Sequence, residues 1–333
     1  MLPLAVPPFP AEIPMPKRFL AGCALLVAST LAAAQAWPAR PIKMVVPFPA
    51  GGPTDVMTRV LSERLANALG QAVVVDNKPG AGGEIGSDYV AKAAPDGYTL
   101  LMATGSTHSV GPYLQKVPYD PVRDFTPLVY VGTATNILLI SPKLGVNNVR
   151  ELIAYAKREP GRLTYASSGV GSVAHLTAEM FASMAGAKLT HVPYKGTQLG
   201  IADMMSGQVG MLFDNVLTAK PHVDAGRLKG IAISSAQRSS IVPDMPTVAE
   251  SGLPGFDSSN WFGLFAPANL PRPVAERIDA ELNRILKEPA VRERFHALGF
   301  EVTGGNGADL TRIMQSEAAK WSKVIHDANV KAE

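Results

Sequence analysis

Two apolar strands joined by a helix constrain the fold of this chain more than any other feature. The β-branched run Ile42 to Val46 predicts a buried strand, and Ala72 to Asn77 predicts a second one. Between them, apolar residues recur at helical spacing after a cap at Thr54 or Asp55 and before the terminator Gly70. These apolar residues are Val56, Val60, Leu61, Leu65 and Leu69. A strand, a helix and a strand in this order form a βαβ unit, so we expect a parallel sheet with covered faces.

The same alternation continues along the chain. Further apolar strands are expected to end at Thr104, Ser168, Asn215 and Ser235, and a helix is expected to begin at Ser172. The C-terminal part is expected to be mainly helical, with apolar stripes that belong to the core. These stripes are Val274, Ile278, Leu282 and Ile285, followed by Leu310, Ile313, Met314, Trp321 and Ile325.

The first 36 residues have the order of a secretory signal. Lys17 and Arg18 precede the apolar run Phe19 to Ala34, which leads into the small-residue sequence Ala-Gln-Ala. This run is shorter than the roughly 20 residues that span a bilayer, so we expect cleavage before Trp37 rather than a permanent anchor. Met15 is expected to be the true start. Removal of 36 of the 333 residues leaves 297, which favours two lobes.

Charge balance and cysteine content exclude several classes of function. Lys and Arg number 31 against 28 Asp and Glu, and no arginine-rich run occurs, so neither nucleic acid nor a membrane surface is an expected partner. Cys23 is the only cysteine, and it lies in the predicted signal. The mature chain is therefore expected to have no disulfide, thiolate metal site or Cys nucleophile. The six histidines are scattered, so no metal site is expected.

Three loops share one pattern. The sequences PFPAGGPTD, TGSTHS and SSGVGS each follow a strand, are rich in small residues, and lead into a helix start. In open α/β sheets, ligands bind beyond the carboxyl ends of the strands, where helix N-termini present unpaired N–H groups and about half a positive charge. None of the loops contains an arginine, so we expect Gly51 and Gly52 to let a small anion approach backbone amides. Each loop alone is also consistent with a plain turn.

Other motifs leave several alternatives open. KPGAGGEIG departs from the dinucleotide-binding fingerprint at Ile85, where a glycine is needed, so we expect a packing turn there. No G-x-S-x-G occurs, and His175 is expected to cap, pack or contact a ligand rather than act as a base. Asp214, at the end of an apolar strand, is either a turn or helix cap or a cleft residue. In a cleft it would favour a ligand with an amine or hydroxyl and penalise extra negative charge.

Four strings, in this order, carry a specific resemblance. They are WPARPIKMVVPFPAGGPTDVMTRVL, NKPGAGGEIGSDYVAKAAPDGYTLL, HVPYKGTQLGIADMMSGQVGMLFDN and PDMPTVAESG. Together they resemble the Bug-type, TctC-like periplasmic substrate-binding proteins of tripartite tricarboxylate transporters, from Trp37 almost to the C-terminus.

The resemblance implies a two-lobed α/β fold of the type II, Venus-flytrap kind. Each lobe is expected to be a mainly parallel sheet flanked by helices. We place residues 37–133 and 235–333 in lobe 1 and residues 134–234 in lobe 2. The crossings between the lobes are expected near Thr133 to Asn136 and near Ser234 to Arg238.

In this family, loops of both lobes grip a carboxylate of the ligand, partly through ordered water. Matched residue by residue, the grip of lobe 1 is expected at Phe48, Ala50, Gly51, Gly52, Thr54 and Asp55, with Ser106, Thr107 and His108 beside it. The grip of lobe 2 is expected at Ser168, Gly169, Gly171, Ser172 and His175, with Asp214 across the cleft. Val170 and Gly111 stand where a polar residue and an asparagine are frequent, which leaves the identity of the ligand open.

The sequence therefore predicts a periplasmic solute-binding protein that captures a small organic carboxylate by hinge closure, with no chemical step and no cofactor. The expected partners are the membrane subunits of a tripartite tricarboxylate transporter or a sensor protein. One alternative is a periplasmic hydrolase on a similar scaffold, which would need a serine, a histidine and an acid within hydrogen-bond reach. The other is a dinucleotide oxidoreductase, which the mismatch at Ile85 disfavours.

Overall fold

The computed structural model describes residues 37–194 and 196–330. The predicted secretory signal over residues 1–36, including the start at Met15 and Cys23, lies outside them. From Arg40 onward the chain forms one compact unit. No helix within the described ranges combines the length and the apolar character that a bilayer crossing needs.

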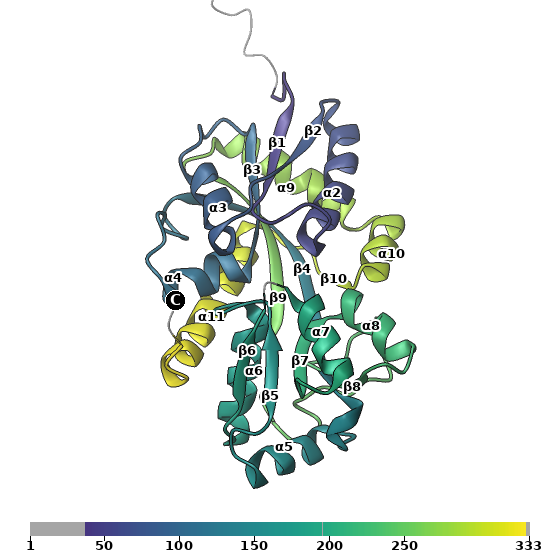
Figure 1. The fold of residues 1–333 in the computed structure, drawn as a ribbon. Coiled ribbons are helices and arrows are strands. Elements are labelled where there is room, and N and C mark those ends of the chain that lie inside the picture. Colours follow the sequence, from purple (N-terminus) through teal and green to yellow (C-terminus); the bar gives the residue numbers. More distant parts are fainter. Residues whose placement is uncertain (1–36, 195, 331–333) are drawn as a thin grey trace, which may run out of the picture. The chain divides into compact units, whose positions relative to one another are not determined.

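The strands pair into a sheet that runs through both lobes of this unit (Figure 1). Along the sheet the order is β2-β1-β3-β9-β4-β7-β5-β6, and β8 and β10 also pair with β4. The strands are β1 Ile42–Val46, β2 Val73–Asn77, β3 Thr99–Thr104, β4 Phe125–Ile140, β5 Thr164–Ser167, β6 Thr190–Pro193, β7 Met211–Asn215, β8 Lys229–Ile233, β9 Ser259–Pro267 and β10 Phe300–Val302. The predicted strand Ile42 to Val46 and the predicted strand ends at Thr104 and Asn215 are confirmed, and the start at Ala72 and the ends at Ser168 and Ser235 differ by one or two residues.

Helices cover the sheet in both lobes (Figure 1). The α-helices are α2 Pro53–Leu69, α3 Glu84–Ala91, α4 Gly111–Leu114, α5 Val149–Arg158, α6 Val173–Ala185, α7 Thr197–Ser206, α8 Val216–Asp224, α9 Arg272–Ile285, α10 Pro289–Ala297 and α11 Gly307–Asp327. The short helices are η1 Ala81–Gly83, η2 Ser106–Val110 and η3 Pro142–Leu144. In α2 the buried apolar residues are Met57, Leu61, Leu65 and Leu69, whereas Val56 and Val60 are only half-buried. The helical face is therefore rotated slightly from the predicted one.

The long strand β4 runs through the centre of the sheet and determines how its strands pair. This strand of 16 residues pairs antiparallel with β9 as far as Thr135, and from Asn136 onward with β7. Parallel pairing joins β1 to β2 and β3, and β5 to β6 and β7, and one isolated parallel bridge joins Ile233 of β8 to Thr247. The α/β fold is as expected, but the centre of the sheet is antiparallel because one long strand serves both lobes.

The segment after β8 was predicted to belong to lobe 1, and part of it packs against lobe 2. Ser239 and Ser240 donate hydrogen bonds to Glu301 of β10, but the chain then returns to the second lobe. Apolar side chains from residues 242–256 pack in the clusters that contain β7 and β8. The lobe boundaries stay a prediction, and this packing favours a second crossing near residue 258 rather than 235.

Candidate functional site

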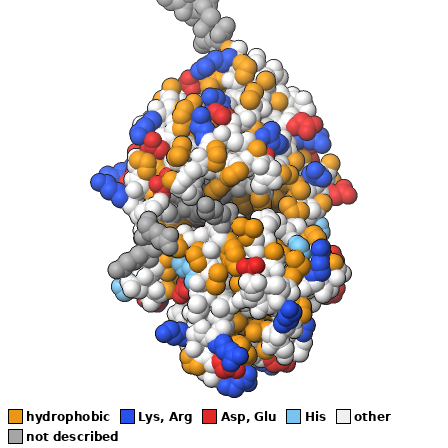
Figure 2. Space-filling view, in the orientation of Figure 1, with side chains coloured by type: hydrophobic (Ala, Val, Ile, Leu, Met, Phe, Trp, Pro, Cys, Tyr) orange, Lys and Arg blue, Asp and Glu red, His pale blue; other side chains and the backbone are white. Residues whose placement is uncertain are grey.

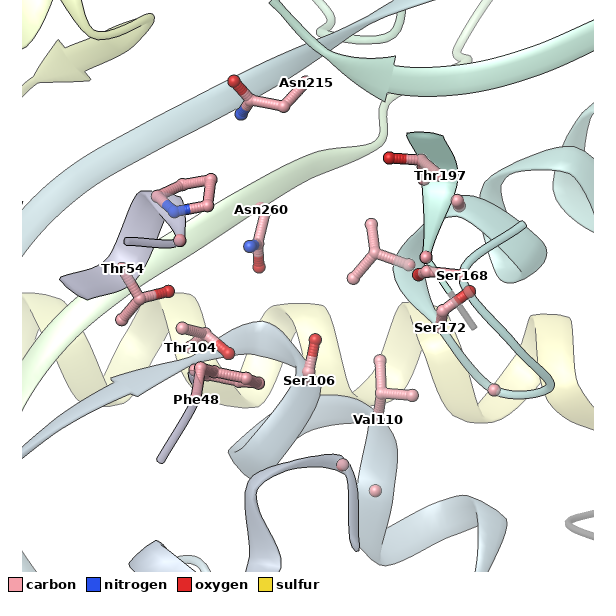
Figure 3. A pocket seen from close by; sticks show the side chains of 18 of the residues that line it. Phe48, Thr54, Thr104, Ser106, Val110, Ser168, Ser172, Thr197, Asn215 and Asn260 are labelled. Atoms are coloured by element: carbon pink, nitrogen blue, oxygen red, sulfur yellow. The ribbon is translucent and has the colours of Figure 1, made fainter. Parts of the chain in front are cut away.

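A cleft of about 840 Å³ lies where the two lobes meet (Figures 2 and 3). Figure 2 shows the molecule hollowed between the lobes, with hydrophobic side chains along the edges of the hollow. In Figure 3, Phe48, Thr54, Thr104 and Ser106 lie on one side, and Ser168, Ser172 and Thr197 face them from the other. Both lobes therefore contribute polar groups to one cavity.

The structure brings about half of the predicted site residues into the lining of this cleft. Those that line it are Phe48, Gly52, Thr54, Ser106, Ser168, Gly171, Ser172 and Asp214. Those that do not are Ala50, Gly51, Asp55, Thr107, His108, Gly169 and His175. Several of the second group have structural roles instead.

The glycine loop before α2 is held by the protein's own carboxylate. Asp55 Oδ2 accepts a hydrogen bond from the Gly51 N–H at 2.9 Å and another from Arg59 Nε at 2.9 Å, while Oδ1 accepts one from Asn77 Nδ2 at 2.9 Å. The predicted cap at Thr54 or Asp55 is wrong, because the helix begins at Pro53 with Gly52 as its N-cap. Gly51 was expected to let an anion approach backbone amides, and the structure shows that the Gly51 amide itself is bound by Asp55.

His108 and Thr107 belong to the core of the first lobe. The imidazole stacks on Phe265 at 4.6 Å between ring centroids and lies 4.7 Å from Phe125. Thr107 Oγ1 lies 2.9 Å from Nδ1. Complete burial lowers the pKa of His108 to about 3, so the ring is neutral. The sequence pattern TGSTHS suggested a polar loop, but the chain turns these two side chains inward.

His175 organises the second lobe's loop without lining the cleft. Its Nδ1 accepts a hydrogen bond from the Gly171 N–H at 3.0 Å, and its ring stacks on His191 at 4.0 Å. Burial, together with His191, lowers the pKa of His175 to about 4. Ser172 caps α6 by accepting a hydrogen bond from the His175 N–H. Gly171 is one of the positions that require glycine, because its φ is 76°.

Three helices start at the cleft wall, and their first amides face it. Gly52 and Gly196 are the N-caps of α2 and α7 and provide no side-chain hydrogen bond. At α6, the side chain of the N-cap Ser172 accepts a hydrogen bond from the His175 N–H. The first N–H groups of a helix have no acceptor within the helix, so those of Thr54, Val173 and Thr197 need an acceptor from outside their helices. These three residues line the cleft. Their helix dipoles add positive potential, which favours an anion.

Charged side chains do not supply this positive potential. Of the described residues that line the cleft, only Glu84 and Asp214 carry a full charge, and both are acidic. Asp214 is 6% exposed and accepts a hydrogen bond from Thr218 Oγ1 at 2.6 Å. Burial raises the pKa of Asp214 to about 6, although hydrogen bonds from Thr218, the Asn215 amide and Thr197 partly oppose this.

Several lining residues were missing from the sequence prediction. They are Ala81, Gly82, Glu84, Thr104, Gln115, Asn136, Thr197 and Asn260, together with apolar residues such as Val110, Leu114 and Phe262. The segment that holds Ala81 and Gly82 was expected to be a packing turn, yet it forms part of the wall. Strand ends gave a usable signal for Thr104 and Asn215. No local signal marks Asn136 or Asn260, which lie inside long strands.

The geometry does not favour the hydrolase alternative. Ser172 Oγ donates to the Gly169 carbonyl, and the ring nitrogen Nδ1 of His175 accepts from Gly171 rather than from a hydroxyl. Ser167 Oγ lies 2.6 Å from His191 Nε2, but Ser167 is fully buried and does not line the cleft.

Comparison with known proteins agrees with this arrangement. Residues 57–330 match the tripartite tricarboxylate transporter family receptor, TctC. The chain is 38% identical to the protein BugT of Bordetella pertussis over 300 residues, which cover 90% of this chain and 92% of BugT. A structure of Rpa4515 from R. palustris with adipate is 35% identical and has a TM-score of 0.80, with coverage of 89% of this chain and 99% of that one.

A structure of the periplasmic binding protein BugD is 35% identical to this chain and has a TM-score of 0.77. The match covers 89% of this chain and 100% of the BugD chain. The matched family is thus one of receptors, and the matched structures include a periplasmic binding protein. The chain belongs to the TctC family of tripartite tricarboxylate transporter receptors and is a solute-binding protein, not an enzyme.

Proposed function

We propose that this protein works in the periplasm, captures a small organic carboxylate in the cleft between its lobes, and delivers it to the membrane subunits of a tripartite tricarboxylate transporter or to a sensor protein. The residues Phe48, Gly52, Thr54, Ser106, Ser168, Gly171, Ser172 and Asp214 would contact the ligand or its bound water. The known structure with adipate makes a carboxylate the natural class.

The observation that carries this proposal is the meeting of three helix starts at a cavity with no basic residue in its described lining. A carboxylate gains from the unpaired N–H groups of Thr54, Val173 and Thr197 without a lysine or arginine. Since α2 belongs to the first lobe and α6 and α7 to the second, a bound carboxylate would join the lobes. A ligand stabilises a closed state only through contacts that the open state lacks, so this bridging is what closure requires.

A thermal-shift screen of carboxylic acids against their primary amides tests the proposal. The mature protein is heated with each acid and with the amide of the same carbon skeleton. Acids should raise the melting temperature and amides should not, because a ligand at a hundredfold above its dissociation constant adds about 2.7 kcal/mol. Failure of every acid to stabilise the protein would remove the proposal.

A glycine variant provides the residue-level test. Gly52 has a φ of −74°, which valine tolerates, so Gly52→Val should fold while its side chain fills the space in front of α2. Ligand affinity measured by calorimetry should fall at least about tenfold. Asn67→Val, at an exposed position of the same helix, is the matched control and should bind as the wild type does. Equal affinity of the two variants would argue against an amide grip at α2.

A further inference from the structure

The floor of the cleft is a separate, uncharged polar surface. It is formed by Thr104 at the end of β3, Asn260 on β9, Asn136 on β4 and Asn215 on β7. On β9 the side chains alternate, so that Asn260 and Phe262 line the cleft while Trp261 packs in the core of the first lobe. Asn136 and Asn215 are direct partners across the antiparallel pair β4 and β7, which places both amides on one face.

Two polar atoms of this floor have no hydrogen-bond partner among the residues that the structure describes. Thr104 Oγ1 and Asn260 Oδ1 are buried and unpaired, and the Thr104 residue is 1% exposed. Figure 3 shows both side chains, with Asn215 beyond them on the same face of the cavity. Buried polar atoms are nearly always paired, since leaving one unpaired is costly. The carbonyl oxygen of Asn260 can only accept, so the group that completes this floor must be a donor.

The charges of the cleft limit what that donor can belong to. Asp214 and Glu84 are the charged groups of the described lining, and both are negative. One carboxylate can sit at the helix starts, where the dipoles favour it. A second carboxylate elsewhere in the cleft would meet acidic side chains and unpaired acceptors, and no basic side chain of the described lining would compensate.

We propose that the ligand is a monocarboxylate with a hydrogen-bond donor, a hydroxyl or an ammonium group, that reaches the cleft floor at Thr104 and Asn260. This inference rests on the proposed function, because it assumes that the helix starts hold the carboxylate. Val110, Leu114 and Val170 line the cleft as well, and they suit a methylene chain between the two ends.

A matched series of ligands tests the inference directly. The first series consists of six-carbon acids with a carboxylate at one end: hexanoate, 6-hydroxyhexanoate, 6-aminohexanoate and adipate. At the other end they carry a methyl, a hydroxyl, an ammonium and a second carboxylate group, respectively. A four-carbon series of butyrate, 4-hydroxybutyrate, 4-aminobutyrate and succinate covers a shorter span. In at least one series, calorimetry on the mature protein should show the hydroxyl or ammonium acid binding about tenfold or more tighter than both the methyl acid and the diacid. Whichever of the two binds tighter identifies the donor.

The outcomes separate this inference from the proposed function. If in neither series the hydroxyl or the ammonium acid binds more tightly than the diacid, the carboxylate-binding function stands and the donor inference is overturned. The donor inference is also overturned if, in both series, the methyl acid binds as tightly as the hydroxyl and ammonium acids. If no acid in either series binds, both the function and the inference are rejected.

Two variants locate the effect at the floor. Thr104→Val keeps the shape of the side chain and removes a hydroxyl that has no partner in the protein, so it should fold normally. It should reduce the preference for the donor acid over the methyl acid by about fivefold or more, with little change for the methyl acid. Asn260→Leu should do the same through the second atom. Thr99→Val, at the other end of β3, is the control and should leave the preference intact. An unchanged preference in both floor variants would overturn the inference.

Discussion

Asp55 Oδ2 lies 2.9 Å from the Gly51 nitrogen and accepts its hydrogen bond. The glycine loop before α2, whose sequence most suggested anion binding, therefore binds the carboxylate of Asp55. Hydrogen bonds from Arg59 and Asn77 complete the shell of this carboxylate. Asp55 does not line the cleft, so we expect it to shape the loop while a ligand meets the amides that follow, at the start of α2.

Replacement of this carboxylate should cost both stability and affinity. In Asp55→Ala the Gly51 amide and Asn77 Nδ2 lose a buried acceptor, so the free energy of unfolding should fall by about 2 to 3 kcal/mol. Ligand affinity should fall as well, because the loop before α2 loses its anchor. Urea denaturation and calorimetry measure the two effects. Asp55→Asn, which keeps one acceptor oxygen, should lie between alanine and wild type, and equal stability of all three would contradict the assigned role.

Asp214 should make the folded state less stable as the pH rises. Burial raises its pKa from 3.8 to about 6, so between these values the folded protein binds more protons than the unfolded one. The contribution of Asp214 to stability is complete below pH 4 and falls by about 3 kcal/mol as the pH passes 6. Asp214→Asn should remove this slope, and denaturation curves at pH 4, 5, 6 and 7 would show it. Parallel profiles for the two proteins would disprove the shift.

His108 should act with the opposite sign. Burial lowers its pKa from 6.5 to about 3, so the unfolded chain binds the proton that the folded chain excludes. Its contribution to stability is present above pH 6.5 and falls by up to about 5 kcal/mol as the pH approaches 3.

His108→Phe isolates this contribution. Phenylalanine suits the aromatic surroundings made by Phe125 and Phe265, so the variant should fold, bind ligand as before, and lose less stability than wild type between pH 6.5 and 4. His326→Gln, at a side chain that is 88% exposed, should keep the wild-type profile. A large loss of ligand affinity in His108→Phe would show that the ring contributes to binding after all.

Gly171 should be sensitive because it meets Leu114 across the cleft. A Cβ at Gly171 would lie 2.5 Å from Leu114 Cδ1, and the φ of 76° is already unfavourable for any other residue. Gly171→Ala should therefore weaken ligand binding about tenfold by hindering closure. Gly145→Ala is a matched control, since Gly145 has a φ of 74° and open space around its Cβ.

The double variant Gly171→Ala with Leu114→Ala separates the two causes. Because Leu114 also lines the cleft, the reference is Leu114→Ala alone: relative to it, the added Gly171→Ala change should cost less affinity than it costs in the wild type, since only the backbone strain remains. Calorimetry of the single, double and control variants gives the comparison. Equal losses in the Gly171 and Gly145 variants would show that strain alone matters and that the lobes do not meet at this point.

Most of the secondary structure of this protein could be predicted from local sequence. The strand Ile42 to Val46 and the αL terminator Gly70 are confirmed, and the helix starts after the glycine-rich loops lie close to the predicted positions. Side-chain period and turn chemistry act over a few residues, so a sequence reveals them directly. The family was equally readable, because its motifs are continuous strings.

Tertiary structure decided which groups face the cleft. Thr107 and His108 look like loop residues but are buried, because the turn after β3 directs them into the aromatic core. The pairing of β3 with β9 places Thr104 opposite Phe262, two residues from Asn260, so that both Thr104 and Asn260 line the cleft although they are more than 150 residues apart in the sequence.

The sequence by itself therefore determined most of the elements and the family, and it predicted a grip by backbone amides rather than basic side chains, since these follow from residue types and their spacing. It could not determine which amides stay unpaired or which polar side chains meet. Those depend on which distant strands pair and in what register, and that is settled only when the whole core packs.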